Sequence, residues 1–157
     1  MEIINVYWAA PLFCQAKRRW NRQCAEYLKS KGYYHIILPQ DDARAFTGDD
    51  GNVDFAALAK HCREQAVRKD IHIMVAILDG SDADSGTSFE AGLRIESGGF
   101  VLGVRTDIRF SEDGHVNAMF RELTDILFFS GLNENYKELC DKIDRKIKEI
   151  LGIESLS

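Results

Sequence analysis

Short apolar runs alternate along the chain with longer stretches in which apolar side chains recur every three or four positions. An apolar run of about 4–8 residues predicts a buried strand, and a period of about 3.6 residues predicts a helix packed against the sheet. The predicted strands have the sequences IINVYWAA (3–10), YYHIILP (33–39), IHIMVAIL (71–78), FVLGVRT (100–106) and DILFFS (125–130). The predicted helices lie between them, at about residues 12–31, 55–69, 87–97 and 133–151.

Strands that alternate with helices indicate a parallel sheet covered on both faces, because right-handed crossovers place a helix after each strand. We therefore predict a single α/β domain over residues 1–157, a flavodoxin-like or Rossmann-like three-layer sandwich with a mostly parallel sheet of about five strands. Ligands bind such sheets beyond the carboxyl ends of the strands. The loops after Ala9, Leu38 and Leu78 should converge there, and we expect residues 40–53 to form a long polar loop.

Single residues refine the predicted helices. Gly32 should stop the first helix, and Asp54 should cap the helix that follows the polar loop. The helical period predicts that the inward side chains of the first helix are Phe13, Trp20, Cys24 and Leu28.

Composition and charge narrow the classes of function. The 157 residues, 45% of them hydrophobic and 29% charged, are typical of a globular domain. The net charge of -5 disfavours a nucleic-acid partner, because neutralising phosphates needs a basic surface. We find no signal-peptide pattern and no stretch long enough to cross a bilayer, so we expect a cytoplasmic protein without membrane contact. The histidines and cysteines lack the spacing of metal ligands, and no GxGxxG or P-loop pattern occurs, so we expect no metal and no cofactor.

The stretch ILDGSDADSGTSFEAG (77–92) gathers carboxylates at the carboxyl end of the third predicted strand. Thr87 and Glu90 have the spacing of a capping box, in which the threonine caps the helix and the glutamate bonds back to its backbone N–H. Spacing alone favours that structural interpretation. An ionised Glu90 at the edge where ligands bind is also a candidate nucleophile, and the acids upstream of it add negative charge that raises a carboxyl pKa.

Three separated motifs resemble the nucleoside 2-deoxyribosyltransferase family. They are AILDGSDADSGTSFEAG, VYWAAPLF and GVRTDIR followed by GHVNAMF, and they occur in the family's order and over about residues 3–130. The resemblance implies exchange of bases between 2′-deoxyribonucleosides, with small-molecule nucleosides and free bases as the partners and without a cofactor. It also implies a homo-oligomer, a dimer or hexamer, whose active sites are shared across a subunit boundary.

The resemblance assigns three catalytic roles. Glu90 matches the nucleophile that attacks C1′ and forms a covalent deoxyribosyl-enzyme, and two such displacements retain the β configuration. Asp84 matches the acid that protonates the leaving base. Tyr7 matches the phenol that holds the nucleophile by a hydrogen bond. From the residues alone, Asp84 is also a candidate N-cap, and a tyrosine such as Tyr7 is more often a core aromatic than a ligand contact.

The resemblance also assigns contacts to the substrate. Phe13 matches an aromatic of the base pocket, Asn117 an asparagine that reaches the site of a neighbouring subunit, and Met119 is a further pocket candidate. Gly86 belongs to the D-x-GT motif beside the sugar. Asp79 is either a sugar contact or a structural residue at the end of its strand. The other interpretations, core packing for Phe13 and a turn after Gly114 for Asn117, stay open.

The base preference is not readable from the chain. The segment from Gln40 to Val53 should close over the base, with Gln40, Asp41 or Asp42 as alternative contacts. Many relatives carry an aspartate where this chain has Cys62, so a contact to a sugar hydroxyl is lost or made otherwise. Arg94 departs from the family pattern, and we expect it to face solvent, a subunit interface or a nearby acid.

Two other functions remain alternatives to base exchange. The same machinery could transfer the sugar to water, as an N-glycosidase acting on 2′-deoxynucleosides or their 5′-monophosphates. The loop sequence AAPLF offers few hydrogen-bond donors for a phosphate, so we rank the N-glycosidase below base exchange. A non-catalytic nucleoside-binding module would keep the pocket without forming a covalent adduct.

Overall fold

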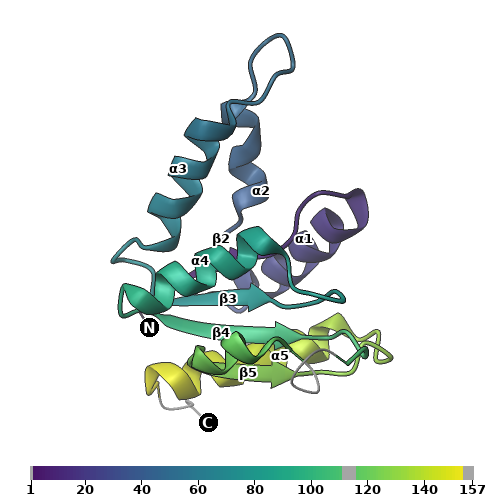
Figure 1. The fold of residues 1–157 in the computed structure, drawn as a ribbon. Coiled ribbons are helices and arrows are strands. Elements are labelled where there is room, and N and C mark those ends of the chain that lie inside the picture. Colours follow the sequence, from purple (N-terminus) through teal and green to yellow (C-terminus); the bar gives the residue numbers. More distant parts are fainter. Residues whose placement is uncertain (1, 111–115, 154–157) are drawn as a thin grey trace.

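The computed structural model describes residues 2–110 and 116–153 of the chain (Figure 1). Its centre is a sheet of five strands, all parallel, in the order β2-β1-β3-β4-β5. The strands are β1 (Ile4–Ala9), β2 (Tyr34–Ile37), β3 (Ile73–Ile77), β4 (Phe100–Arg105) and β5 (Asp125–Phe128). This is the flavodoxin-like order, so the predicted fold class is confirmed.

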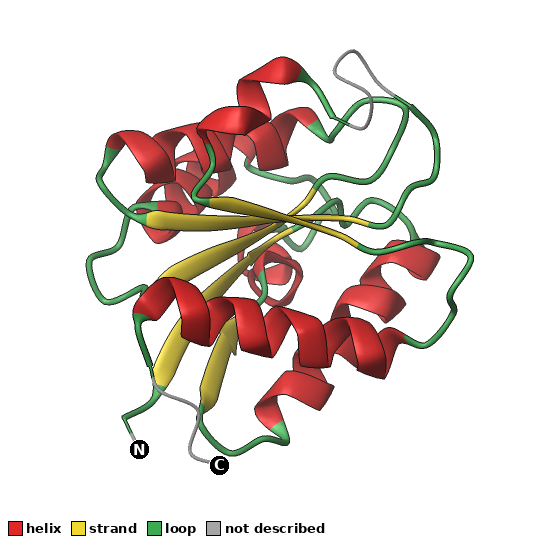
Figure 2. Ribbon diagram, turned by 90° about the horizontal axis from the view of Figure 1, so that it is seen from below, coloured by secondary structure: helices red, strands yellow, loops and turns green. Residues whose placement is uncertain are grey.

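Four long helices cover the two faces of the sheet (Figure 2). They are α1 (Gln15–Lys29), α3 (Phe55–Ala66), α4 (Ser85–Glu96) and α5 (Tyr136–Leu151). One core cluster joins the sheet to α1 and α5, and the other joins it to α3 and α4. Side chains of a strand alternate between faces, so Val6 and Trp8 enter the first cluster while Tyr7 enters the second.

The ligand-binding edge follows from this topology. The chain leaves β1 toward α1 on one face and leaves β3 toward α4 on the other, although β1 and β3 are neighbours in the sheet. Such a switch point opens a crevice at the carboxyl ends of the two strands. Ala10, after β1, and Asp84, before α4, both line the cavity found at this crevice.

The predicted polar loop at residues 40–53 is partly wrong. It contains a short helix α2 (Pro39–Asp42), a 3-10 helix (Ala43–Phe46) and an isolated antiparallel bridge between Thr47 and Val53. Proline is tolerated at the first position of a helix, where an N–H would lack a partner anyway, so Pro39 begins the short helix instead of only closing the strand. In Figure 1, α2 and α3 stand out from the sheet on the side of α4.

Several of the remaining ends differ by a few residues from the prediction, and the cap of α3 agrees with it. Asp54 caps α3 as predicted, its side chain accepting from the Ala57 N–H at 3.0 Å. The first helix begins only at Gln15, which leaves Phe13 before the helix and 78% exposed, not inward. An unpredicted 3-10 helix (Ala118–Glu122) precedes β5. Among the described residues, no helix is long and apolar enough to span a membrane.

The expectation that Arg94 faces solvent, an interface or an acid is wrong. Its side chain is only 5% exposed and donates to the backbone carbonyls of Arg68, at 2.9 Å, and Ile71. It thereby ties α4 to the segment that enters β3. Gly99 leaves room for this packing, since a Cβ there would overlap the guanidinium.

Candidate active site

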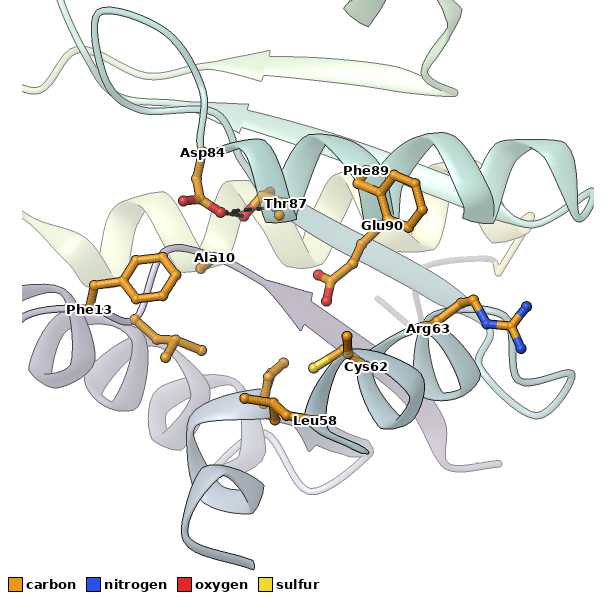
Figure 3. Close-up of a pocket in the computed structure, with 13 residues that line it drawn as sticks. Ala10, Phe13, Leu58, Cys62, Arg63, Asp84, Thr87, Phe89 and Glu90 are labelled. Atoms are coloured by element: carbon orange, nitrogen blue, oxygen red, sulfur yellow. Dashed lines mark hydrogen bonds between the residues drawn. The ribbon is translucent and has the colours of Figure 1, made fainter. Parts of the chain in front are cut away.

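A cavity of about 270 Å³ lies at the switch point, between the carboxyl end of β1, the helix α3 and the first half of α4 (Figure 3). Its walls are mostly apolar and carry two carboxylates, Asp84 and Glu90. The other lining residues are Ala10, Leu12, Phe13, Pro39, Leu58, Ala59, Cys62, Arg63, Gly86, Thr87 and Phe89. A concave apolar site with a few converging polar groups is the usual form of a small-molecule site.

Glu90 is held by the strand beneath it. Tyr7 of β1 is buried, and its hydroxyl donates to Glu90 Oε1 at 3.0 Å. Burial raises the pKa of Glu90 to about 7, the charge of Asp84 adds to the rise, and the Tyr7 hydrogen bond opposes it. Burial and the charge of Glu90 also raise the pKa of Tyr7, so the phenol keeps its proton and remains a donor. Glu90 is thus poised between its two protonation states near neutral pH.

Asp84, not Thr87, caps α4. Asp84 Oδ2 accepts from the Thr87 backbone N–H at 3.0 Å and from the Thr87 hydroxyl at 3.3 Å. The predicted capping box is therefore wrong: Thr87 lies inside the helix, and Glu90 bonds to Tyr7. The cap leaves the second Asp84 oxygen on the side of Phe13 and Ala10 (Figure 3).

Gly86 also lines the cavity, and its place explains part of the D-x-GT motif. A Cβ at residue 86 would lie 3.2 Å from Asp84 Oδ2, which is tighter than an ordinary contact. A glycine therefore lets the Asp84 carboxylate sit against the first turn of the helix.

The helix α3 forms the wall opposite α4. The side chains of Leu58 and Cys62, four residues apart, face the cavity, and Glu90 points toward them (Figure 3). Burial, and next the charge of Glu90, raise the pKa of the Cys62 thiol. The guanidinium of Arg63 turns away from Glu90.

Gln40 and Asp79 are two of the four predicted substrate contacts that do not line the cavity. The Gln40 side chain is buried, accepts from Asn21 Nδ2 at 3.2 Å and donates to the Arg18 carbonyl at 3.0 Å, so its amide is held within the protein. Asp79 accepts from the Thr106 hydroxyl at 2.6 Å and from the Asp107 N–H at 2.9 Å. Of the two interpretations of Asp79, the structure favours the structural one, because its carboxylate anchors the segment after β4.

Asn117 and Met119 lie at a second hollow, of about 740 Å³, on another side of α4. Asn117 caps the 3-10 helix by accepting from the Met119 N–H at 3.0 Å, and Met119 is 75% exposed. Phe89 is 64% exposed and lines both hollows. Within one chain, Asn117 and Glu90 are therefore not brought together. Gly114, which precedes Asn117 in its motif, lies outside the described residues.

Among the described residues, no group of three or more histidine, cysteine or acidic side chains could hold a metal ion. The ionisable groups at the apolar cavity are the carboxylates of Asp84 and Glu90, the thiol of Cys62 and the guanidinium of Arg63, and the phenol of Tyr7 bonds to Glu90. A buried carboxyl with a raised pKa, Glu90, lines the same cavity as a second carboxylate, Asp84, that caps the helix.

The model of one family, described as nucleoside 2-deoxyribosyltransferase, matches residues 6–127. The chain belongs to this family. The match includes Tyr7, Asp84, Glu90 and Asn117, and it supports deoxyribosyl transfer as the class of chemistry. Among curated proteins, the comparison found no match.

Solved structures share the deoxyribosyltransferase fold. A conserved protein from Enterococcus faecalis V583 is 22% identical, with a TM-score of 0.72, and the match covers 92% of this chain and 99% of that one. A 2-deoxyribosyltransferase from Bacillus psychrosaccharolyticus is 17% identical, with a TM-score of 0.61 and coverage of 91% and 95%. A 2-desoxiribosyltransferase from Leishmania mexicana is 19% identical, with a TM-score of 0.58 and coverage of 79% and 89%.

Leu58 and Phe89 are among the residues lining the cavity that sequence reasoning did not single out. Leu58 precedes Cys62 by one helical turn, so the position singled out at Cys62 was a usable signal for it. No sequence signal indicated that Phe89 lines the cavity. It directly precedes Glu90, and neighbouring residues of a helix point in different directions.

Proposed function

We propose that the protein moves 2-deoxyribose between purine or pyrimidine bases through a covalent intermediate on Glu90. A Glu90 oxygen attacks C1′ of the nucleoside as the C1′–N bond to the base breaks. The base departs with a proton from Asp84. A second base then attacks C1′ from the face that the first left, gives its N–H proton to Asp84 and returns the carboxylate of Glu90, so the β configuration is retained.

The observation that carries this proposal is the hydrogen bond between the Tyr7 hydroxyl and Glu90 Oε1 inside the cavity. The bond fixes one carboxylate oxygen and leaves Oε2 for C1′. It also favours the ionised form of Glu90 against the burial that raises its pKa to about 7. The same contact would hold the carboxylate as a leaving group when the sugar is released.

Asp84 and Phe13 mark the end of the cavity proposed for the base. The free side of the Asp84 carboxylate lies toward Phe13, whose exposed ring offers a face on which a base can stack (Figure 3). Protonating the leaving base lowers the barrier to breaking the C1′–N bond, by general acid catalysis worth about 10²–10⁴-fold. The negative charges of both carboxylates favour the oxocarbenium-like transition state.

We also propose that a second copy of the chain completes the site in a homo-oligomer. Asn117 and Met119 lie in the hollow on another side of α4 from Glu90, and Phe89 connects the two hollows. In this proposal Asn117 serves the cavity of a neighbouring copy instead of its own. Sedimentation that finds a fully active monomer would remove Asn117 from the site.

The test of the function is chromatography of 2′-deoxyinosine with and without added adenine. The proposal predicts 2′-deoxyadenosine and hypoxanthine only in the tube with adenine, and no turnover by Glu90→Gln in either. Free deoxyribose and hypoxanthine in both tubes would mean that the protein is a hydrolase. No reaction with intact nucleoside binding would mean a binding module.

A further inference from the structure

Two of the four cysteines meet in the core on the face of the sheet that α1 and α5 cover. Cys24 of α1 and Cys140 of α5 are 116 positions apart in the chain, and neither side chain is exposed. The Cys140 thiol donates weakly to the Cys24 backbone carbonyl, with an S···O distance of 3.9 Å. The Cys24 thiol in turn forms a hydrogen bond with the Cys140 thiol, so the two sulfurs are in contact.

This contact is more than the use of cysteine as a small apolar residue requires. A disulfide needs the two sulfurs to approach to about 2.05 Å, with Cβ atoms roughly 3.8 Å apart. The other two cysteines are placed differently: Cys14 is exposed just before α1, and Cys62 lines the cavity on the opposite face of the sheet. Cys14 precedes Cys24 by about 15 Å of helix. Among the cysteines, Cys24 and Cys140 are therefore the pair arranged for a bond within one chain.

The surroundings of the pair make its oxidation slow. The hydrogen bond with Cys140, and next burial, raise the pKa of the Cys24 thiol well above its usual range. Thiolates, not thiols, attack oxidants, so the folded chain offers very little of the reactive form. An oxidant also reaches these sulfurs only when α1 and α5 separate locally. The same burial protects a bond, once formed, from reductants.

We propose that Cys24 and Cys140 form a latent disulfide that fastens α1 to α5 after prolonged exposure to a peroxide. The thiolate of one cysteine attacks a peroxide oxygen, the O–O bond breaks, and a sulfenic acid and hydroxide form. The thiolate of the other attacks the sulfenic sulfur, the S–O bond breaks, and a second hydroxide leaves. The two thiol protons convert both hydroxides to water, so two thiols and one hydrogen peroxide give one disulfide and two waters.

The bond would act on stability and not on the cavity. It joins residues 116 positions apart, so it removes a large share of the conformational freedom of the unfolded chain. A disulfide that closes so long a loop should raise Tm by about 4–16 °C. The cavity lies between α3 and α4, on the other face of the sheet. The inference is therefore independent of the function proposed above.

The experiment oxidises the folded protein overnight with hydrogen peroxide, alkylates the remaining thiols and digests the chain without reduction. Mass spectrometry should find the peptide of Cys24 joined to that of Cys140, two hydrogens lighter than the separate peptides. The oxidised protein should melt at the higher Tm. Dithiothreitol should reverse both changes slowly in buffer and rapidly in urea, because unfolding exposes the bond.

Variants locate the effect, and each is compared only with its own reduced form. Cys24→Ala and Cys140→Ala should lose both the cross-link and the rise in Tm, with Cys24→Ser as the replacement if an alanine variant does not fold. Cys14→Ser is the matched control and should keep both, because the Cys14 side chain makes no cap hydrogen bond and serine also caps helices.

Three results would overturn the proposal. The first is oxidised wild-type protein in which Cys24 and Cys140 are recovered as thiols, as sulfinic acids or in bonds to other cysteines. The second is a cross-link that leaves Tm unchanged. The third is a rise in Tm on oxidation that persists in Cys140→Ala or disappears in Cys14→Ser.

Discussion

Replacing Tyr7 with phenylalanine removes the hydroxyl that donates to Glu90 Oε1 at 3.0 Å, and we expect the pKa of Glu90 to rise. A hydrogen bond to a charged group contributes about 1.5–3 kcal/mol, and each pKa unit corresponds to about 1.4 kcal/mol. The loss therefore shifts the pKa from about 7 upward by about one to two units. At pH 7 the ionised fraction should fall from about one half to between about one tenth and one hundredth.

The assay is kcat/KM for base exchange measured across pH, in wild type and in Tyr7→Phe. The acidic limb should move upward by about one to two pH units, with activity about 5–50-fold lower at pH 7 and largely recovered on the alkaline side. Tyr27→Phe is the control, because the Tyr27 hydroxyl donates to Asp141 at 3.0 Å far from the cavity. An unmoved acidic limb, or a loss of equal size at every pH, would refute the coupling of Tyr7 to the ionisation of Glu90.

Three further variants test other parts of the account. Glu90→Gln should have no turnover. The raised pKa of Glu90 lowers the free energy of unfolding of the wild type increasingly from about pH 4.5 to above 7, so the variant should be more stable by about 1–3 kcal/mol at pH 8.5 and nearly equal in stability at pH 4. Chemical denaturation that shows the same difference at both pH values contradicts this. Asp84→Asn should keep the fold, since asparagine also caps helices, and lose roughly 10²–10⁴-fold in exchange rate; a wild-type rate would remove its role as the acid. Arg94→Ala removes the guanidinium that donates to the Arg68 and Ile71 carbonyls and should lower the free energy of unfolding by about 1.5–3 kcal/mol, seen in urea titrations, while an unchanged midpoint would refute the structural role of Arg94.

The fold was predictable because the apolar positions of each strand and each long helix follow the pattern expected for that element. The run at residues 71–78 is apolar at nearly every position, as a central strand covered on both faces requires. The short helix that begins at Pro39 was not predictable, because four residues hold too few apolar positions to show a period. The burial of Arg94 was also hidden, since it depends on carbonyls that only the folded chain brings within reach.

Residues of the site that belong to a sequence motif could be predicted, whereas contacts that depend on tertiary packing could not. The resemblance identified Tyr7 and Glu90, which lie 83 positions apart, and the structure joins them by a hydrogen bond. The capping-box interpretation of Glu90 failed because helix α4 starts two residues before Thr87, at a cap provided by Asp84. The burial of Gln40 was not predictable, because its amide bonds to Asn21 and Arg18, which are distant in sequence.

The central claim is that the carboxylate of residue 90 forms a bond to the anomeric carbon, and the most direct measurement traps that bond. The protein is incubated with a 2′-fluoro-2′-deoxynucleoside, whose fluorine slows release of the sugar, and is then digested and analysed by mass spectrometry. The account predicts the mass of the fluorinated sugar on the peptide that contains Glu90, absent in Glu90→Gln. An adduct on another residue, or none in a preparation that exchanges bases, would contradict it.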